Sequence, residues 1–213
     1  MYIEFRNVSK VIGKSKVIDN INYRFDTGKV YGLSGKNGAG KTMLMRLMCG
    51  LIRPSSGEVD IDGEILGKNI SFPPSVGVLI ENPAFLPNYT GFKNLKLISD
   101  IRDCVSSEEI KSIMTMVGLD PYDKRQYRKY SLGMKQKLGV ACAFLGNPNI
   151  VILDEPINAL DEQSVPLIHE LIDKHKEDSI IIVACHDKEE LRSLSDTVIY
   201  LDSGKILREE DTV

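Results

Sequence analysis

The stretch "YGLSGKNGAGKT" at residues 31–42 sets the architecture of the chain, because it joins an apolar segment to a glycine-rich turn. Gly35, Gly40, Lys41 and Thr42 fit the spacing G-x-x-x-x-G-K-[ST], with strand-forming residues before the turn and helix-forming residues after it. Glycines let successive backbone N–H groups converge on phosphate oxygens, and the start of a helix adds positive potential. The residues that we expect to form this phosphate loop are Asn37, Gly38, Ala39, Gly40, Lys41, Thr42 and Met43.

This loop predicts a binding site for a nucleoside triphosphate. In loops of this kind the lysine, here Lys41, reaches the β and γ phosphates, and the hydroxyl, here of Thr42, ligates Mg²⁺. The alternative is a glycine turn that starts a helix by coincidence, and the complete match in spacing and context disfavours it. The loop alone does not choose among kinases, GTPases, motors and transport ATPases.

Two adjacent acids narrow the choice towards hydrolysis. The segment "IVILDEP" is an apolar strand that ends in Asp154 and Glu155, and parallel sheets bind their ligands at the carboxyl ends of strands. Asp154 would hold Mg²⁺ directly or through water, and Glu155 would polarise an attacking water molecule. The other possibility is a solvated pair of acids at a strand end.

His186 follows the apolar segment "SIIIVAC" and is expected at the same sheet edge. An imidazole there could contact the γ phosphate, although a lone histidine after a strand is usually incidental. His169 and His175 lie in a polar helical stretch and are interpreted as incidental.

The composition is typical of a folded globular protein, and its charge balance predicts that nucleic acid is not a partner. The 213 residues are 42% hydrophobic, and 27 basic residues are balanced by 30 acidic ones, which leaves no basic surface for nucleic acid. The start of the chain lacks the apolar stretch of a secretory signal, and the aliphatic run at residues 180–184 is far too short to span a bilayer. The cysteines have no CxxC spacing and are interpreted as buried free thiols: Cys49, Cys104, Cys142 and Cys185.

Short apolar runs alternate with helical segments, which indicates an α/β fold. Strands are expected at residues 2–6, 17–25 and 29–33, with the alternation of an antiparallel sheet in the second of them. A helix is expected at residues 42–49, and the segments "GEVDIDG" and "SVGVLI" are expected to form two more strands. Residues 90–146 have helical periodicity, with a capping box at Ser106 and Glu109. The continuous aliphatic runs "IVIL", "SIIIVAC" and "TVIYL" are typical of a parallel sheet that is buried on both faces.

The segment "YSLGMKQKLGVACAFLGNP", Tyr130 to Pro148, resembles the signature of ABC transporter nucleotide-binding subunits, usually written LSGGQ. Ser131 and Gly133 are retained, whereas Leu132 and Met134 replace a glycine and a glutamine. Ser131 followed by a helix is also a capped helix start, and so a second site for an anion, although a plain helix cap is the alternative. GTPases and small-molecule kinases have no such segment, and the chain lacks the guanine motif N-K-x-D.

The resemblance covers the whole chain and implies its fold class, a P-loop NTPase (RecA-like) core with an N-terminal antiparallel β subdomain and an inserted α-helical signature subdomain. It implies one nucleotide-binding domain at residues 1–213, with the core at about 1–88 and 147–213 and the helical subdomain at about 89–146. It also implies ATP hydrolysis with Mg²⁺ and a head-to-tail dimer in which the signature of one subunit closes on the ATP of the other. Asp161, in the segment "NALD" that begins at Asn158, matches the loop that crosses this interface, and His186 matches the family's switch histidine.

The implied partners are a transmembrane permease and a second nucleotide-binding subunit, identical or not, at the cytoplasmic face of the membrane. Phe85, Leu86 and Tyr89 belong to a stretch expected to be exposed and to receive the permease; the alternative is that they fold back on the helical subdomain. Two residues depart from the family pattern. Glu81 stands where glutamine is common, and we expect it to link the metal to the permease; Ile12 stands where an aromatic residue stacks on adenine, and we expect loose base selectivity.

"LIENPAF" and the signature segment resemble the subgroup that exports, or confers immunity to, lantibiotics and bacitracin-like antimicrobial peptides. Two alternatives stay open at this point. One is a soluble ABC ATPase in translation or DNA repair, which usually carries two cassettes or a long coiled-coil insertion. The other is a non-catalytic ATP-binding partner subunit, and the presence of Glu155 argues against it.

Overall fold

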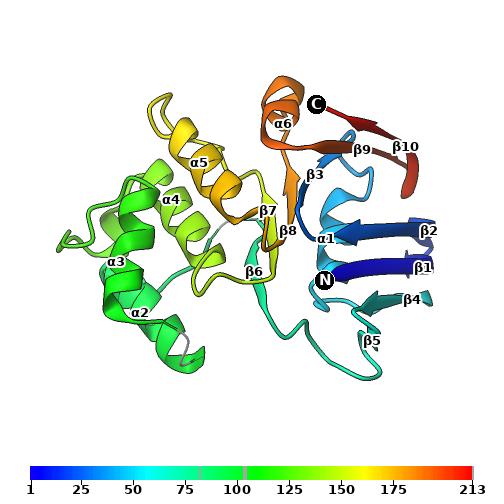
Figure 1. Cartoon of the computed structure of the whole chain (residues 1–213), viewed down its shortest axis with the longest axis horizontal. Helices are drawn as coiled ribbons and strands as arrows, with labels where there is room; N and C mark the ends of the chain where they lie inside the picture. Colours follow the sequence, from blue (N-terminus) through cyan, green and yellow to red (C-terminus); the bar gives the residue numbers. More distant parts are fainter. Residues whose placement is uncertain (82, 103–104, 213) are drawn as a thin grey trace.

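The computed structural model describes residues 1–81, 83–102 and 105–212, whose strands form a four-stranded sheet and a six-stranded sheet (Figure 1). In the order of pairing, the four-stranded sheet contains β2 (Ser15–Asp26), β1 (Tyr2–Ile12), β4 (Ser56–Ile61) and β5 (Glu64–Ile65). The six-stranded sheet contains β10 (Lys205–Asp211), β9 (Thr197–Asp202), β3 (Lys29–Ser34), β8 (Ile180–Ala184), β7 (Ile150–Asp154) and β6 (Val76–Leu79). The helices are α1 (Lys41–Met48), α2 (Gly91–Arg102), α3 (Ser107–Met116), α4 (Leu132–Ala143), α5 (Val165–His175) and α6 (Lys188–Leu194), with a 3₁₀ turn, η1, at Tyr127–Lys129.

The N-terminal sheet is antiparallel, as predicted, but its first two strands are longer than the apolar pattern indicated. β1 pairs with β2 and with β4, and it continues through the mostly polar segment at residues 6–10 to Ile12. Register shifts along β1 and the left-handed Asn7, at φ 53°, absorb the break in alternation. Cross-strand pairing therefore extended the strands beyond the residues that alternate.

The six-stranded sheet is parallel from β6 to β9, which confirms the prediction made from the aliphatic runs. Successive side chains of β7 alternate between two hydrophobic cores: Ile150 and Ile152 face α1 and the antiparallel sheet, and Val151 and Leu153 face the other helices. β8 follows the same alternation. The antiparallel edge strand β10 was not predicted, because its sequence is mostly charged and exposed.

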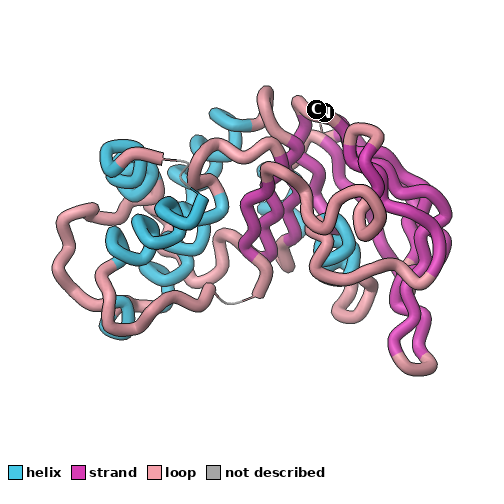
Figure 2. The backbone as a smooth tube through the Cα atoms, turned by 90° about the horizontal axis from the view of Figure 1, so that it is seen from below, coloured by secondary structure: helices cyan, strands magenta, loops and turns pink. Residues whose placement is uncertain are grey.

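The segment between β6 and β7 is helical, as predicted, and its helices lie on one side of the parallel sheet (Figure 2). The capping box of Ser106 and Glu109 at the start of α3 is present. α4 packs directly on β6, and a Cβ on Gly77 of that strand would lie 1.6 Å from the carbonyl oxygen of Ala143. Glycine is therefore required at this position for helix and sheet to approach so closely.

Cys49 and Cys185 are buried, unpaired thiols, as predicted, and burial raises the pKa of the Cys49 thiol to about 12. Cys142 is partly exposed, so the prediction of burial is wrong for it. Cys104 lies outside the described residues. Every helix in the described part of the chain is too short or too polar to cross a bilayer.

Candidate active site

The predicted phosphate loop connects the end of β3 to the start of α1, with backbone N–H groups at the start of the helix. Gly40 precedes the helix at φ 110°, a conformation that residues with a side chain rarely adopt. A Cβ added at this position would lie 3.0 Å from the carbonyl oxygen of Val17. Lys41 is 8% exposed and donates from Nζ to the Gly35 carbonyl oxygen at 2.5 Å. Its ammonium group therefore braces the loop from within.

A cavity of about 350 Å³ opens over this loop. Its walls include the loop itself, the ends of β7 and β8, and Val17 of β2. Residues from segments far apart in the chain thus share one space, as the sequence predicted for the loop, the acid pair and the histidine. The lining residues are Val17, Lys36, Asn37, Gly38, Ala39, Gly40, Lys41, Thr42, Met43, Asp154, Glu155 and His186.

Thr42 and Asp154 form an oxygen-rich corner of the cavity. The Thr42 hydroxyl donates to Asp154 Oδ2 at 3.2 Å across 112 residues of sequence. Burial raises the pKa of Asp154, although the hydrogen bond from Thr42 and the charge of Lys41 act in the opposite direction. Proteins hold Mg²⁺ through one or two carboxylates together with substrate phosphates and water, and this hydroxyl and carboxylate fit that donor set.

Glu155 lies beside this corner in an unusual backbone conformation. Its φ is 54°, and its backbone N–H donates to the Ala184 carbonyl oxygen of β8 at 2.9 Å. The backbone N–H of His186 donates to Glu155 Oε2 at 3.2 Å, and His186 Nε2 lies 3.6 Å from Oε1. Burial raises the pKa of Glu155, and the hydrogen bond from His186 partly opposes this. His186 thus contacts both carboxylate oxygens of Glu155, which also lines the cavity.

Sequence reasoning missed three residues at this site: Val17, Lys36, which lines the cavity just before the predicted loop residues, and Gln136. Val17 lines the cavity, although the sequence indicated only that it belongs to the strand with alternating apolar residues that became β2. Gln136 of α4 is 8% exposed and donates from Nε2 to the backbone carbonyl oxygen of Glu155 at 2.7 Å. Its place in the signature segment, as the uncharged polar residue between Lys135 and Lys137, was the available signal.

Ser131, Gly133 and Asp161 do not line the cavity, and they lie together elsewhere. Ser131 caps α4, and its hydroxyl accepts from the backbone N–H of Met134 at 3.2 Å, as predicted. A Cβ on Gly133 would lie 2.8 Å from the carbonyl oxygen of Ala159, so the start of α4 packs against the segment at residues 158–161. Asp161 itself pairs with Ser164.

Glu81 and Ile12 also lie outside the cavity lining. The Glu81 carboxylate is paired with Arg46 of α1, and its side chain is 62% exposed. Its charge adds a small contribution to the raised pKa of Asp154, after the larger effect of burial. Ile12 ends β1 and is 50% exposed. The roles assigned to both residues stay predictions.

Because Ile12 offers no aromatic face, we expect GTP to bind within about tenfold of ATP, equivalent to about 1.4 kcal/mol. Titration of the purified protein with each nucleotide measures this ratio. Ile12→Tyr is expected to increase the preference for ATP, and Val11→Tyr, at the neighbouring exposed position on the opposite face of the strand, is the matched control. Strict selection of ATP by the unmodified protein would contradict the prediction.

The loop after Glu81 only partly agrees with the predicted exposure. Leu86 is 51% exposed, but the Phe85 ring packs against Tyr127 with ring centroids 5.3 Å apart. Tyr89 is half-buried, with the ammonium group of Lys93 4.1 Å from its ring centroid. Phe85 was predicted wrongly because its ring joins the hydrophobic core of the helices.

Comparison with known proteins places these features in one family. The ABC transporter family model matches residues 18–158. An uncharacterized ABC transporter ATP-binding protein of Bacillus subtilis (strain 168), YybJ, is 44% identical and covers 99% of this chain and 97% of its own length. The bacitracin transport ATP-binding protein BcrA of Enterococcus faecalis is 36% identical, with 97% of this chain and 68% of BcrA covered. The lantibiotic transport ATP-binding protein SrtF of Streptococcus pyogenes is 33% identical, with 98% of this chain and 90% of SrtF covered.

The fold is similar to that of solved structures of the same kind. A dimeric structure of a bacterial ABC transporter cassette superposes with a TM-score of 0.88 at 24% identity, covering 99% of each chain. At this identity the likeness establishes the fold alone.

Proposed function

The chain belongs to the ABC transporter family as an ATP-binding, ATP-hydrolysing subunit, and from that premise we propose that it powers the export of, or immunity to, bacitracin-like and lantibiotic peptides. The assignment of the cargo to this class of peptides rests on one observation. Proteins whose names specify bacitracin and lantibiotic transport are 36% and 33% identical to this chain over 97% and 98% of its length. The signature variant and Glu81, both noted in the sequence, agree with this subgroup.

We propose that the cavity over the phosphate loop binds ATP and that Glu155 is the general base. Backbone N–H groups of the loop and Lys41 hold the phosphates, and His186 contacts the γ phosphate. Glu155 accepts a proton as water attacks the γ phosphorus; the bond to the bridging oxygen breaks, and ADP and phosphate leave. The raised pKa of the Glu155 carboxylate supports its use as a proton acceptor.

Thr42 and Asp154 are the residues that we propose to hold Mg²⁺, and Glu81 is the third candidate. Their support is the hydroxyl–carboxylate contact at 3.2 Å within the cavity. When bound, Mg²⁺ supplies neutralisation of charge on the β and γ phosphate oxygens. Glu81 has weaker support than the other two residues, because its carboxylate pairs with Arg46.

A second chain is needed to complete the proposed site. Ser131, Gly133 and Asp161 lie outside the cavity of their own chain, yet Ser131 caps a helix start that suits an anion. We propose that they contact the ATP and phosphate loop of a second copy or a related subunit. The residue range proposed for the signature-bearing helical subdomain is about 89–146, which contains α2, α3 and α4.

We propose that a transmembrane permease docks beside Glu81 and holds the protein at the cytoplasmic face of the membrane. A groove of about 360 Å³ lies there, with Arg46 and Glu81 beside the apolar Leu51, Phe85 and Ile98. Leu51 and the nearby Leu86 are more than half exposed. A mixed surface of this kind suits an amphipathic segment of a partner.

The test of this function is a resistance assay in a peptide-sensitive bacterium that expresses the chain together with its permease. We expect the inhibitory concentration of bacitracin or of a lantibiotic to rise at least about fourfold, and we expect Glu155→Gln to abolish the increase because transport then has no energy source. An unrelated antibiotic is the control for general fitness. Equal resistance with active and inactive protein would refute the peptide assignment and leave the ATPase assignment standing.

A further inference from the structure

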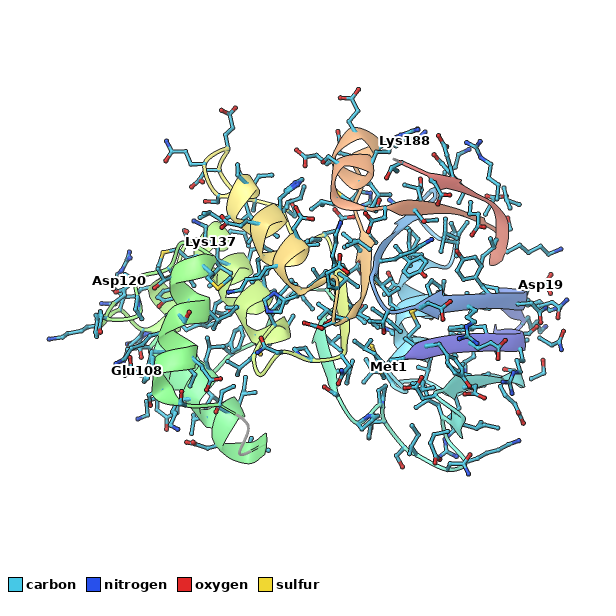
Figure 3. The ribbon with its side chains drawn as sticks, viewed as in Figure 1. Met1, Asp19, Glu108, Asp120, Lys137 and Lys188 are labelled. Carbon is cyan, nitrogen blue, oxygen red and sulfur yellow. The ribbon has the colours of Figure 1, made fainter. Side chains whose placement is uncertain are left out.

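Gln136 connects α4, the helix that begins in the signature segment, to the peptide group of Glu155. Its side chain is buried in α4, five residues after the capping Ser131, and its amide donates to the Glu155 carbonyl oxygen at 2.7 Å. Lys137, the next residue, is labelled in Figure 3 among the helices, on the opposite side of the molecule from Asp19 of β2. The glutamine thus reaches from the helical part of the protein to the edge of the parallel sheet.

The peptide group that Gln136 contacts follows a residue, Glu155, whose backbone conformation is unfavourable by itself. Glu155 has φ 54°, a backbone region that a non-glycine residue rarely adopts unless its surroundings impose it. Its N–H is bonded to Ala184, and its carbonyl oxygen accepts a second, longer hydrogen bond from the N–H of Asn158 at 3.2 Å. Ala184 lies on β8 and Asn158 in the turn that follows Glu155, so Gln136 supplies the restraint from α4.

We propose that Gln136 is a positioning residue, which fixes the direction of the Glu155 carboxylate and joins it to the start of α4 at Ser131. This inference rests on the proposed roles of Glu155 as general base and of Ser131 as a contact to the nucleotide of a second chain. Because α4 is one continuous helix from Leu132 to Ala143, a displacement of its start by a partner is transmitted to Gln136 and so to Glu155. One short hydrogen bond therefore links the two nucleotide sites of a dimer.

The test is Gln136→Met, which keeps the length and volume of the side chain and removes the donor. We expect kcat for ATP to fall about tenfold to a hundredfold, since small misplacements of a catalytic group have effects of this size. The nucleotide dissociation constant and the number of sites per chain are expected to stay within about twofold, because Lys41 and Thr42 are untouched. A merely structural role would instead reduce the number of competent sites.

Two further variants make the result specific. Gln136→Glu keeps the shape but places a carboxylate oxygen against a carbonyl oxygen, and we expect at least as large a loss of kcat. Gln126→Met makes the same chemical change at a glutamine whose amide oxygen accepts from Arg128 at the surface, and we expect no loss. Wild-type turnover together with unchanged kcat in folded Gln136→Met would overturn this inference alone. Absence of turnover in the wild-type protein would overturn the proposed function with it.

Discussion

Glu155→Gln is expected to reduce ATP turnover by about a thousandfold and to leave nucleotide binding intact. Glutamine keeps an oxygen that accepts from the backbone N–H of His186, so the local geometry survives. It cannot accept the proton of the attacking water, and general-base catalysis of this kind contributes about a hundredfold to ten-thousandfold. Steady-state phosphate release and a nucleotide titration measure the two quantities separately.

The same variant also tests the proposed dimer. Because ATP is bound but not hydrolysed, two chains are expected to stay closed around it, and light scattering should report the mass of a dimer in ATP and of a monomer without it. Glu177→Gln, at an exposed position, is the matched control and should behave as wild type. A nucleotide-saturated Glu155→Gln protein that stayed monomeric at every concentration, even beside its permease and any second cassette, would contradict the shared site.

Lys41→Met is expected to weaken ATP binding by about tenfold to a hundredfold and to abolish measurable turnover. Hydrogen bonds to charged groups contribute about 1.5–3 kcal/mol, and the ammonium group is buried at the base of the loop. In the structure its Nζ also donates to the Gly35 and Lys36 carbonyl oxygens, so the loop loses its internal brace. Methionine fills the same volume without a charge.

Calorimetric titration with ATP and Mg²⁺ measures the affinity of Lys41→Met, and thermal unfolding confirms that the variant is folded. Lys124→Ala removes an exposed lysine in the loop before η1 and is expected to change neither quantity. Affinity and turnover equal to those of the wild-type protein would show that the cavity over the phosphate loop is not where ATP is hydrolysed.

Local features of the chain were predictable because short-range chemistry causes them. The phosphate loop, the capping box of Ser106 and Glu109, and the helix cap at Ser131 each depend on residues within a few positions of one another. The aliphatic runs of β7 and β8 predicted a sheet buried on both faces, since nothing else would hide so many branched side chains from water.

Other features were decided by tertiary structure. β1 and β2 extend beyond their apolar residues because neighbouring backbones pair, and Phe85 turns inward because the ring of Tyr127 is there to receive it. The contact of Thr42 with Asp154 and that of Gln136 with Glu155 join segments brought together by the sheet and by α4. The sequence by itself determined which groups can bind a triphosphate and activate water. Only the folded chain decided their distances and restraints, because these depend on how helices and strands pack and not on the order of residues along one segment.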